Sequence, residues 1–196
     1  MSTIVPTAND EYDHDIFISY QYDNTTQVAK LYDKLTTTYE IKCWLDIKSL
    51  KVGDDLSEKI LKAIKACKIL ICCMTKNYSQ SRYCQKELVV ADSLNKKIIV
   101  LMFENQRLKD LGKIGLIMDK FIRINIFKDS DALNYWCGNL ASALFVTIET
   151  MLGIDLSAKI DEENSVYKKQ APLNSNNNNN NIKEQKQNEK QDTARK

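Results

Sequence analysis

Residues 69–74 form an uninterrupted apolar run, Ile-Leu-Ile-Cys-Cys-Met, and no other segment constrains the fold as strongly. A strand that is apolar at every position must be covered on both faces, which is typical of parallel sheets flanked by helices. A polar loop follows at residues 75–82, and a helix is predicted to begin at about Tyr83 with Glu87 in its first turn. The pattern therefore places a carboxylate at the carboxyl end of a buried strand, the edge where open α/β sheets bind ligands.

Strand-like and helix-like segments alternate along most of the chain. Runs rich in β-branched and aromatic residues predict the other strands, at residues 15–20, 41–45, 97–103 and 121–126. Apolar residues at helical spacing predict helices at about residues 28–35, 55–67, 83–95, 106–118 and 131–152. This order predicts a flavodoxin-like, doubly wound, five-stranded parallel sheet, strand order 2-1-3-4-5, flanked by helices. Its switch point would bring together the loops at residues 20–24, 46–54 and 75–82.

Composition divides the chain into three parts. We expect a flexible N-terminus over residues 1–11, a folded domain over residues 12–155, and a disordered tail rich in Asn, Lys and Gln over residues 156–196. The tail contains the asparagine run Asn176–Asn181 and few apolar residues, so it lacks the apolar surface needed to offset the entropy of ordering. Eight of the 28 basic and six of the 26 acidic residues lie in this tail, so the rest carries 20 of each.

The balanced charge argues against nucleic acid as a partner, because phosphate binding needs a concentrated basic face. No apolar run reaches the roughly 18 residues that a membrane span requires, and the N-terminus has no signal-peptide pattern. The six cysteines have no metal-type spacing and are expected to be reduced, small apolar side chains. We therefore expect a cytoplasmic protein without a membrane span.

Several chemistries are excluded by missing residues. The single histidine, His14, precedes the first strand at the end opposite the expected site, which argues against a Cys-His or Ser-His pair and a histidine-based zinc site. None of the five glycines forms a phosphate-binding loop. A phosphoacceptor receiver would need an aspartate ending strand three, where the chain has Met74-Thr75-Lys76. We expect no bound metal and no cofactor.

Carboxylate chemistry remains. One carboxylate can assist cleavage of a glycosidic bond by stabilising a cationic sugar, and a leaving group that is already cationic needs no acid. Glu87 is the candidate, but it could equally be a first-turn acid that only stabilises its helix, by about 0.3–1 kcal/mol. Tyr83 could stack on a substrate or pack beneath the loop, and Asp46 could bind a ligand or simply end a strand. Asp23, Asp54 and Asp55 are further carboxylates in the expected loops.

Three segments resemble the boxes of the TIR (Toll/interleukin-1 receptor/resistance) domain family. His14-Asp15-Ile16-Phe17-Ile18-Ser19-Tyr20 is similar to the first box. Trp44-Leu45-Asp46, Leu50 and Gly53 resemble the second box with its BB loop. Ser81, Tyr83, Cys84, Glu87 and Leu88 resemble the family's Ser-x-Trp-Cys-x-x-Glu-Leu segment. Gln21 and Tyr83 depart from the family's usual arginine and tryptophan.

The resemblance implies two functions. Many TIR domains cleave NAD+ at the nicotinamide–ribose bond on self-assembly, and in those Glu87 would be catalytic. Tyr20, Gln21, Asp46, Leu50 and Tyr83 would then surround NAD+, which is a substrate and not a cofactor. Other TIR domains are non-enzymatic adaptors that signal by binding other TIR domains through the BB loop. In both cases the implied partners are other TIR domains, including further copies of this chain.

Overall fold

The computed structural model describes residues 13–46 and 56–170, and its centre is one five-stranded parallel sheet. The strand order is β2-β1-β3-β4-β5, as the alternation of segments predicted. The strands are β1 (Ile16–Ser19), β2 (Cys43–Trp44), β3 (Ile69–Met74), β4 (Lys97–Met102) and β5 (Ile122–Ile124). The flavodoxin-like prediction is therefore confirmed, and β1 and β3 lie side by side at the switch point.

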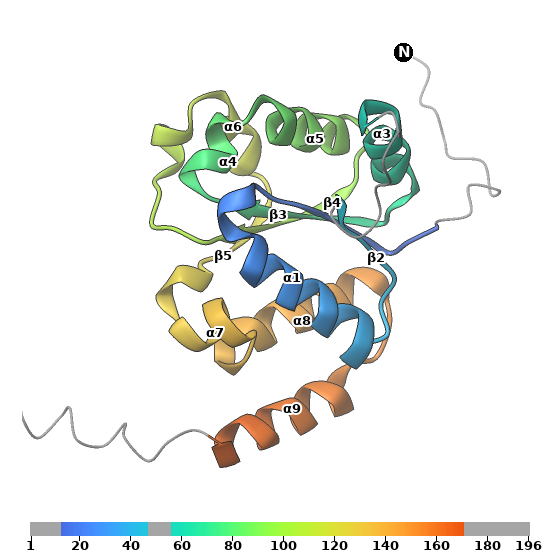
Figure 1. Ribbon diagram of the computed structural model, residues 1–196, viewed down its shortest axis with the longest axis vertical. Coiled ribbons are helices and arrows are strands. Elements are labelled where there is room, and N and C mark those ends of the chain that lie inside the picture. The colour runs from blue at the N-terminus through green and yellow to red at the C-terminus, as the bar shows by residue number, and fades with distance from the viewer. Residues whose placement is uncertain (1–12, 47–55, 171–196) are drawn as a thin grey trace, which may run out of the picture.

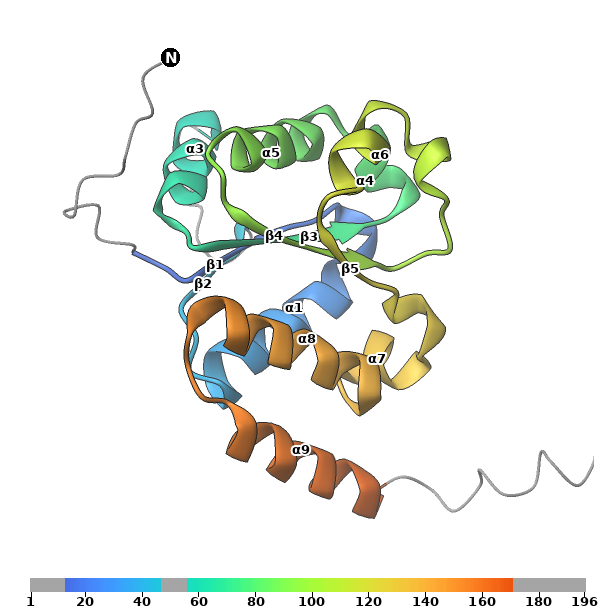
Figure 2. The ribbon, with the colours of Figure 1, turned by 180° about the vertical axis from the view of Figure 1, so that it is seen from behind.

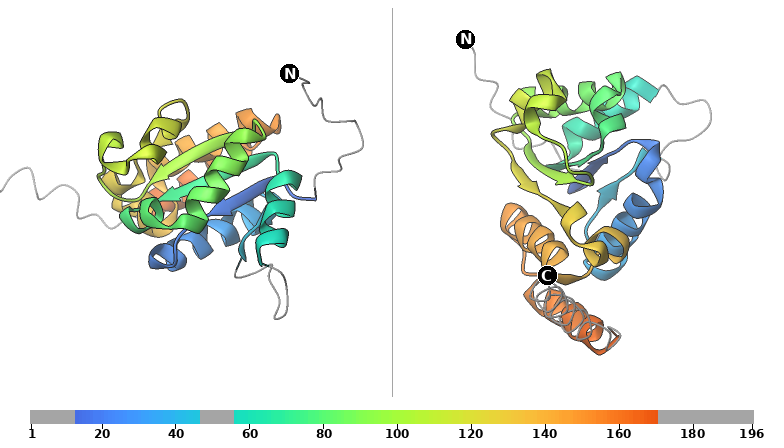
Figure 3. Two further views of the ribbon diagram at one scale, coloured as in Figure 1. Left: turned by 90° about the horizontal axis from the view of Figure 1, so that it is seen from above. Right: turned by 90° about the vertical axis from the view of Figure 1, so that its left-hand side faces the viewer.

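Helices cover both faces of the sheet, so the domain has three layers (Figures 1 and 2). One face carries α3 (Leu56–Ala66), α4 (Lys76–Gln80), α5 (Arg82–Ser93) and α6 (Lys113–Met118). The other carries α1 (Thr25–Asp33), the π-helical turn Lys34–Thr38, α7 (Ser130–Tyr135) and α8 (Gly138–Leu152). The view from above in Figure 3 shows α3 and α5 lying over the sheet.

Strand β3 explains why two cores form. Ile69, Ile71 and Cys73 belong to the core beneath α1 and α8, and Leu70, Cys72 and Met74 belong to the core beneath α3 and α5. All six side chains are fully buried. Burial of each large aliphatic side chain stabilises a fold by about 1.5–3 kcal/mol, so this strand is a main source of stability. The uninterrupted apolar run is the direct consequence.

The segment predicted as one helix over residues 131–152 is two helices, α7 and α8. The break is at Trp136, which has left-handed backbone angles of φ 54° and ψ 45°. Its indole is buried, packs edge-on against Phe103, and donates a hydrogen bond from Nε1 to the Gln27 carbonyl at 2.8 Å. The prediction was wrong because Trp136 has the spacing of the apolar stripe of a continuous helix. In the structure the helix ends at this residue, and its ring anchors the end of α7 against α1.

The expected disordered tail was wrong for its first part. Helix α9 (Ser157–Gln170) packs outside α8, as Figures 1 and 2 show. Leu156 and Ile160 bury their side chains in the core, and this apolar anchoring offsets the ordering entropy that composition alone suggested was too large. Residues 171–196 and 1–12 lie outside the described residues, so the predictions made for them are not tested.

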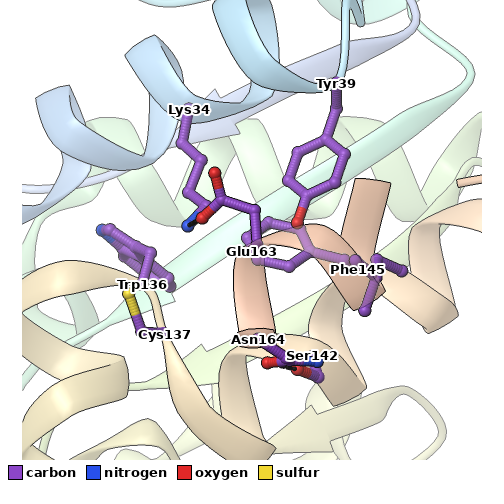
Figure 4. A pocket seen from close by; sticks show the side chains of 9 residues that line it. Lys34, Tyr39, Trp136, Cys137, Ser142, Phe145, Glu163 and Asn164 are labelled. Atoms are coloured by element: carbon purple, nitrogen blue, oxygen red, sulfur yellow. Dashed lines mark hydrogen bonds and ion pairs between the residues drawn. The ribbon is translucent and has the colours of Figure 1, made fainter. Parts of the chain in front are cut away.

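Polar contacts fix the orientation of α9 around a small cavity of about 10 Å³ (Figure 4). Lys34 of the π-helical turn forms an ion pair with Glu163, and Ser142 Oγ donates to Asn164 Oδ1 at 3.0 Å. Tyr167 donates a hydrogen bond to Asp131 near the far end of the helix. The helix is therefore a docked part of the domain, held along its length.

Smaller differences concern the ends of elements. The predicted helix at residues 106–118 is a 3-10 turn, Leu108–Leu111, followed by α6, with Gly112 between them at φ 59°. The strands predicted at residues 41–45 and 121–126 are shorter, and α4 was not predicted. Gly153 ends α8 with left-handed backbone angles, as expected. Within the residues that the structure describes, no helix has the length and apolar character to cross a bilayer.

Candidate active site

Glu87 lies in the second turn of α5. Ser81 caps this helix, because its Oγ accepts a hydrogen bond from the Cys84 amide at 3.4 Å, and α5 then begins at Arg82. The first turn contains no acidic residue. The sequence had placed Glu87 in that turn, where it could have served the helix dipole alone, but the dipole acts within the first turn only. The structure thus removes the simplest non-catalytic explanation of Glu87.

The Glu87 carboxylate points back to the end of β1. Ser19 is the last residue of that strand and is fully buried, and its Oγ donates to Glu87 Oε2 at 2.5 Å. Burial raises the pKa of Glu87 to about 7, assisted by the negative charge of Asp46 and opposed by the hydrogen bond from Ser19. At neutral pH the group can therefore both carry and release a proton.

A cleft of about 180 Å³ opens between α3 and α5 beside Glu87. Ile60 and Ile64 of α3 form its apolar side, and Tyr83 and Lys86 line it together with Glu87. The Tyr83 ring is 63% exposed, with the Lys86 ammonium 5.8 Å from its centroid. Complete ligand pockets measure roughly 300–1,000 Å³. The cleft therefore has room for part of a dinucleotide, with an aromatic face and a carboxylate on one helix.

Asp46 lies near enough to Glu87 for its charge to act on that carboxylate, and Tyr20 lies next to Asp46, but neither residue lines this cleft. The Tyr20 ring is buried, and burial together with the neighbouring Asp46 carboxylate raises the pKa of its hydroxyl well above the usual range. Cys84 Sγ donates to the Tyr20 carbonyl at 3.4 Å and ties the loop after β1 to α5. Asp46 therefore acts on Glu87 through its charge, and Tyr20 acts through its backbone contact with α5, the helix that carries Glu87.

Gln21 lies on a second hollow, of about 480 Å³, next to the start of α5. Its side-chain oxygen accepts a hydrogen bond from the Tyr22 amide at 2.6 Å and so caps the 3-10 turn Tyr22–Asn24. Asn77 of α4 donates to Asp23 Oδ2 at 3.0 Å, which joins the loops after β1 and β3. Two of the three predicted loops therefore meet. Leu50, Asp54, Asp55 and most of the third loop lie outside the described residues.

Two residues of the site were not predicted as site residues, namely Ser19 and Tyr78. Ser19 had been assigned to a strand and to the first box without a role at the site, and Tyr78 only to a polar loop, yet both are buried beside the Glu87 carboxylate. A buried tyrosine in an otherwise polar loop carries no sequence signal of its own. His14 is also buried, at the entry to β1, where its Nε2 lies 2.8 Å from the Ala63 carbonyl.

The fold and the site together define a class: a parallel α/β domain with a desolvated glutamate at the switch point between β1 and β3. The sequence pattern of the family described as TIR domain matches residues 16–135. The chain therefore belongs to the TIR-domain family, and the resemblance seen in the three boxes is confirmed.

Known proteins with similar sequences or folds agree with this. A probable 2′ cyclic ADP-D-ribose synthase, BdTIR of Brachypodium distachyon, is 31% identical over 99 residues, which are 50% of this chain and 44% of that protein. The chain thus spans less than half the length of this curated relative.

Two solved structures have related folds. The TIR domain of the Toll-related receptor TRR-2 from Hydra magnipapillata has a TM-score of 0.52 at 20% identity, covering 69% of this chain and 98% of that one. The TIR domains of the activated Roq1 resistosome, which recognises the pathogen effector XopQ, have a TM-score of 0.44 at 23% identity, covering 76% and 96%. The first likeness supports the fold alone, and the second is too distant to add to it.

Proposed function

We propose that this TIR domain cleaves NAD+ at the nicotinamide–ribose bond, with Glu87 as the catalytic residue. The observation that carries the proposal is the Glu87 carboxylate, desolvated against Ser19 and open to the cleft that Tyr83 lines. The relative from Brachypodium distachyon adds support, because it is named for a cyclic ADP-ribose product. An ADP-ribose group is what NAD+ leaves behind when nicotinamide departs.

The chemistry requires little beyond one carboxylate. The bond between C1′ of the ribose and the nicotinamide nitrogen breaks, and its electron pair stays on the nitrogen, so neutral nicotinamide leaves without an acid. The ribose becomes an oxocarbenium cation, which an ionised Glu87 stabilises electrostatically. Water then attacks C1′ and loses a proton to Glu87, giving ADP-ribose; attack by a ribose hydroxyl would give a cyclic product instead.

Self-association is part of the proposal. Tyr83 offers one aromatic face and is 63% exposed, so a stacked ring would be covered on one side only. A second copy of the domain could supply the other side and exclude water. We therefore expect the rate per molecule to increase with protein concentration. A cytoplasmic location is also proposed, supported by all six cysteines being free thiols.

The test is nicotinamide release from NAD+ by the purified protein at rising protein concentration. Glu87→Gln keeps the size and hydrogen bonding of the side chain but removes its charge, and it is expected to lower the rate by roughly 100-fold or more. Glu162→Gln is the matched control, because Glu162 is exposed on α9. Absence of turnover at every concentration would instead favour a non-enzymatic adaptor that binds other TIR domains.

The pH dependence provides a second test. The carboxylate must be ionised to stabilise the cation, and burial raises the pKa of Glu87 to about 7. The rate is therefore expected to fall about tenfold per pH unit below a midpoint near 7 and to level off above it. A midpoint near that of an ordinary glutamate would show that Glu87 is not the group that limits the rate.

A further inference from the structure

A short line of hydrogen bonds leads from Glu87 into the interior. Ser19 Oγ donates to Glu87 Oε2 at 2.5 Å, and the hydroxyl of Tyr78 lies 2.7 Å from the same Oγ. The Tyr78 hydroxyl is also 3.2 Å from the carbonyl oxygen of Cys84. The three elements involved are β1, α4 and α5. Ser19 and Tyr78 are 1% and 0% exposed, so their hydroxyl protons must be satisfied within the protein.

The protons can be placed consistently when Glu87 is ionised. Ser19 then donates to Oε2, and Tyr78 donates to Ser19. A carboxylate is an acceptor only, so both hydroxyl groups must point toward it. The hydrogen bond that the described residues make to the Glu87 carboxylate is the one from Ser19 to Oε2. The other oxygen, Oε1, is then left to bind a ligand in the cleft.

The protons can be placed equally well when Glu87 is protonated. Glu87 then donates to Ser19, Ser19 donates to Tyr78, and Tyr78 donates to the Cys84 carbonyl. Each hydroxyl group has reversed its direction, and no buried donor has lost its acceptor. An unpaired buried donor would be costly, so an arrangement that satisfies both charge states permits Glu87 to change its charge without disturbing the core.

We propose that Ser19 and Tyr78 are positioning residues for Glu87, which hold its Oε2 atom and reverse their hydrogen bonds when Glu87 takes up a proton. The role in turnover depends on the proposed function of Glu87. The hydrogen-bond reversal itself does not depend on NAD+ cleavage, because it involves only the Glu87 carboxyl group, the hydroxyl groups of Ser19 and Tyr78, and the Cys84 carbonyl.

Other ionisable groups around Glu87 are compatible with this proposal. Burial raises the pKa of the Cys84 thiol to about 11, and it raises the pKa of the Cys72 thiol and of the Tyr78 hydroxyl above their usual ranges, so all three are neutral near pH 7. Asp46 contributes a negative charge that favours protonation of Glu87.

Among the described residues, the cleft adds one cation and no further acid. Helix α3 contributes Ser57 and apolar side chains, and Lys86 contributes the ammonium group. Among the described residues that line the cleft, Glu87 is thus the acid whose charge changes near neutral pH.

The direct test is the titration of Glu87 in the NAD+-free protein, followed by NMR with 13C-labelled glutamate carboxyl groups. The Glu87 signal is assigned by its loss in Glu87→Gln. In Ser19→Ala the ionised form loses its donor, so the proton affinity of Glu87 is expected to rise roughly tenfold. In Tyr78→Phe the protonated form loses the acceptor for the Ser19 proton, so the affinity is expected to fall by a few-fold or more.

Shifts in opposite directions are the signature of the reversal, because general loosening of the fold would move both variants the same way. Ser19→Thr retains a hydroxyl group and is expected to restore a titration close to that of the unaltered protein. Equal titrations in all variants, or shifts of the same sign in Ser19→Ala and Tyr78→Phe, would overturn the proposal.

Nicotinamide release separates this inference from the proposed function. At pH 9, where Glu87 is ionised in each variant, Ser19→Ala is expected to lower kcat about tenfold with KM changed less than twofold. Unchanged kcat in an active protein would refute the positioning role while leaving the proposed function intact. Opposite titration shifts in a protein that does not cleave NAD+ would refute the proposed function and leave the hydrogen-bond reversal standing.

Discussion

Replacing Glu87 by glutamine is expected to stabilise the folded domain at alkaline pH while lowering the proposed activity by roughly 100-fold or more. Burial raises the pKa of Glu87 from an ordinary 4.5 to about 7 in the folded state. The folded domain thus binds this proton more tightly than the unfolded chain does. Below pH 4.5 both states are protonated and there is no penalty; between pH 4.5 and 7 the penalty grows; above pH 7 it is complete.

The size of the effect follows from the same values. The difference between 4.5 and about 7 corresponds to roughly 3 kcal/mol of lost folding free energy at pH 8. Because the Glu87 side chain retains partial exposure, solvent screening reduces the expected gain of Glu87→Gln to about 1–3 kcal/mol. For a domain of this size that is an increase in Tm of about 3–10 °C.

Thermal unfolding of Glu87→Gln and the unaltered protein, measured from pH 4 to pH 9, tests this reasoning. The two curves of Tm against pH are expected to meet near pH 4 and to separate as the pH rises, with Glu87→Gln higher. Glu162→Gln, on exposed α9, is expected to follow the unaltered protein throughout. If Glu87→Gln unfolds at the same or a lower temperature at pH 8, the carboxylate is not desolvated.

Two further predictions concern packing. In Gly115→Ala the new Cβ would lie 2.0 Å from the Leu108 carbonyl oxygen, so urea unfolding is expected to show a loss of about 1–3 kcal/mol. A loss below half a kcal/mol would contradict that close approach. Ile160→Ala on α9 is expected to cost about 2–4 kcal/mol because Ile160 is buried, whereas Val166→Ala, at an exposed position on the same helix, is expected to change little. Equal effects of the two α9 variants would show that α9 is not anchored.

Long apolar elements were predictable from the sequence. Strand β3 was predicted with its observed bounds, because both of its faces are buried and every position had to be apolar. The position of Glu87 after that strand followed from the same pattern. Strand β2 was predicted too long, since the apolar residues Ile41 and Leu45 pack in the core on either side of a two-residue ladder.

Contacts between distant residues were not predictable. Helix α4 has five residues and no apolar periodicity, and its start depends on Thr75 Oγ1 accepting from the Tyr78 amide at 3.0 Å. The link between Ser19 and Tyr78 joins positions 59 residues apart, which no local pattern encodes. Helix α9 is polar in sequence because most of its side chains are exposed. Contacts at only a few positions anchor it to the domain, and these contacts form no apolar periodicity that could be recognised in the sequence.

The docking of α9 determines where the protein can be shortened. Trimming after residue 155 would remove Leu156 and Ile160 and expose Tyr39 and Phe145 to water; the rings of these two residues pack at a tilt of 37°, with centroids 4.4 Å apart. A newly exposed hydrophobic patch of this kind promotes aggregation. Affinity tags or fluorescent fusions are better attached beyond Gln170, the last residue of α9, because they then leave the packing of α9 on the domain intact.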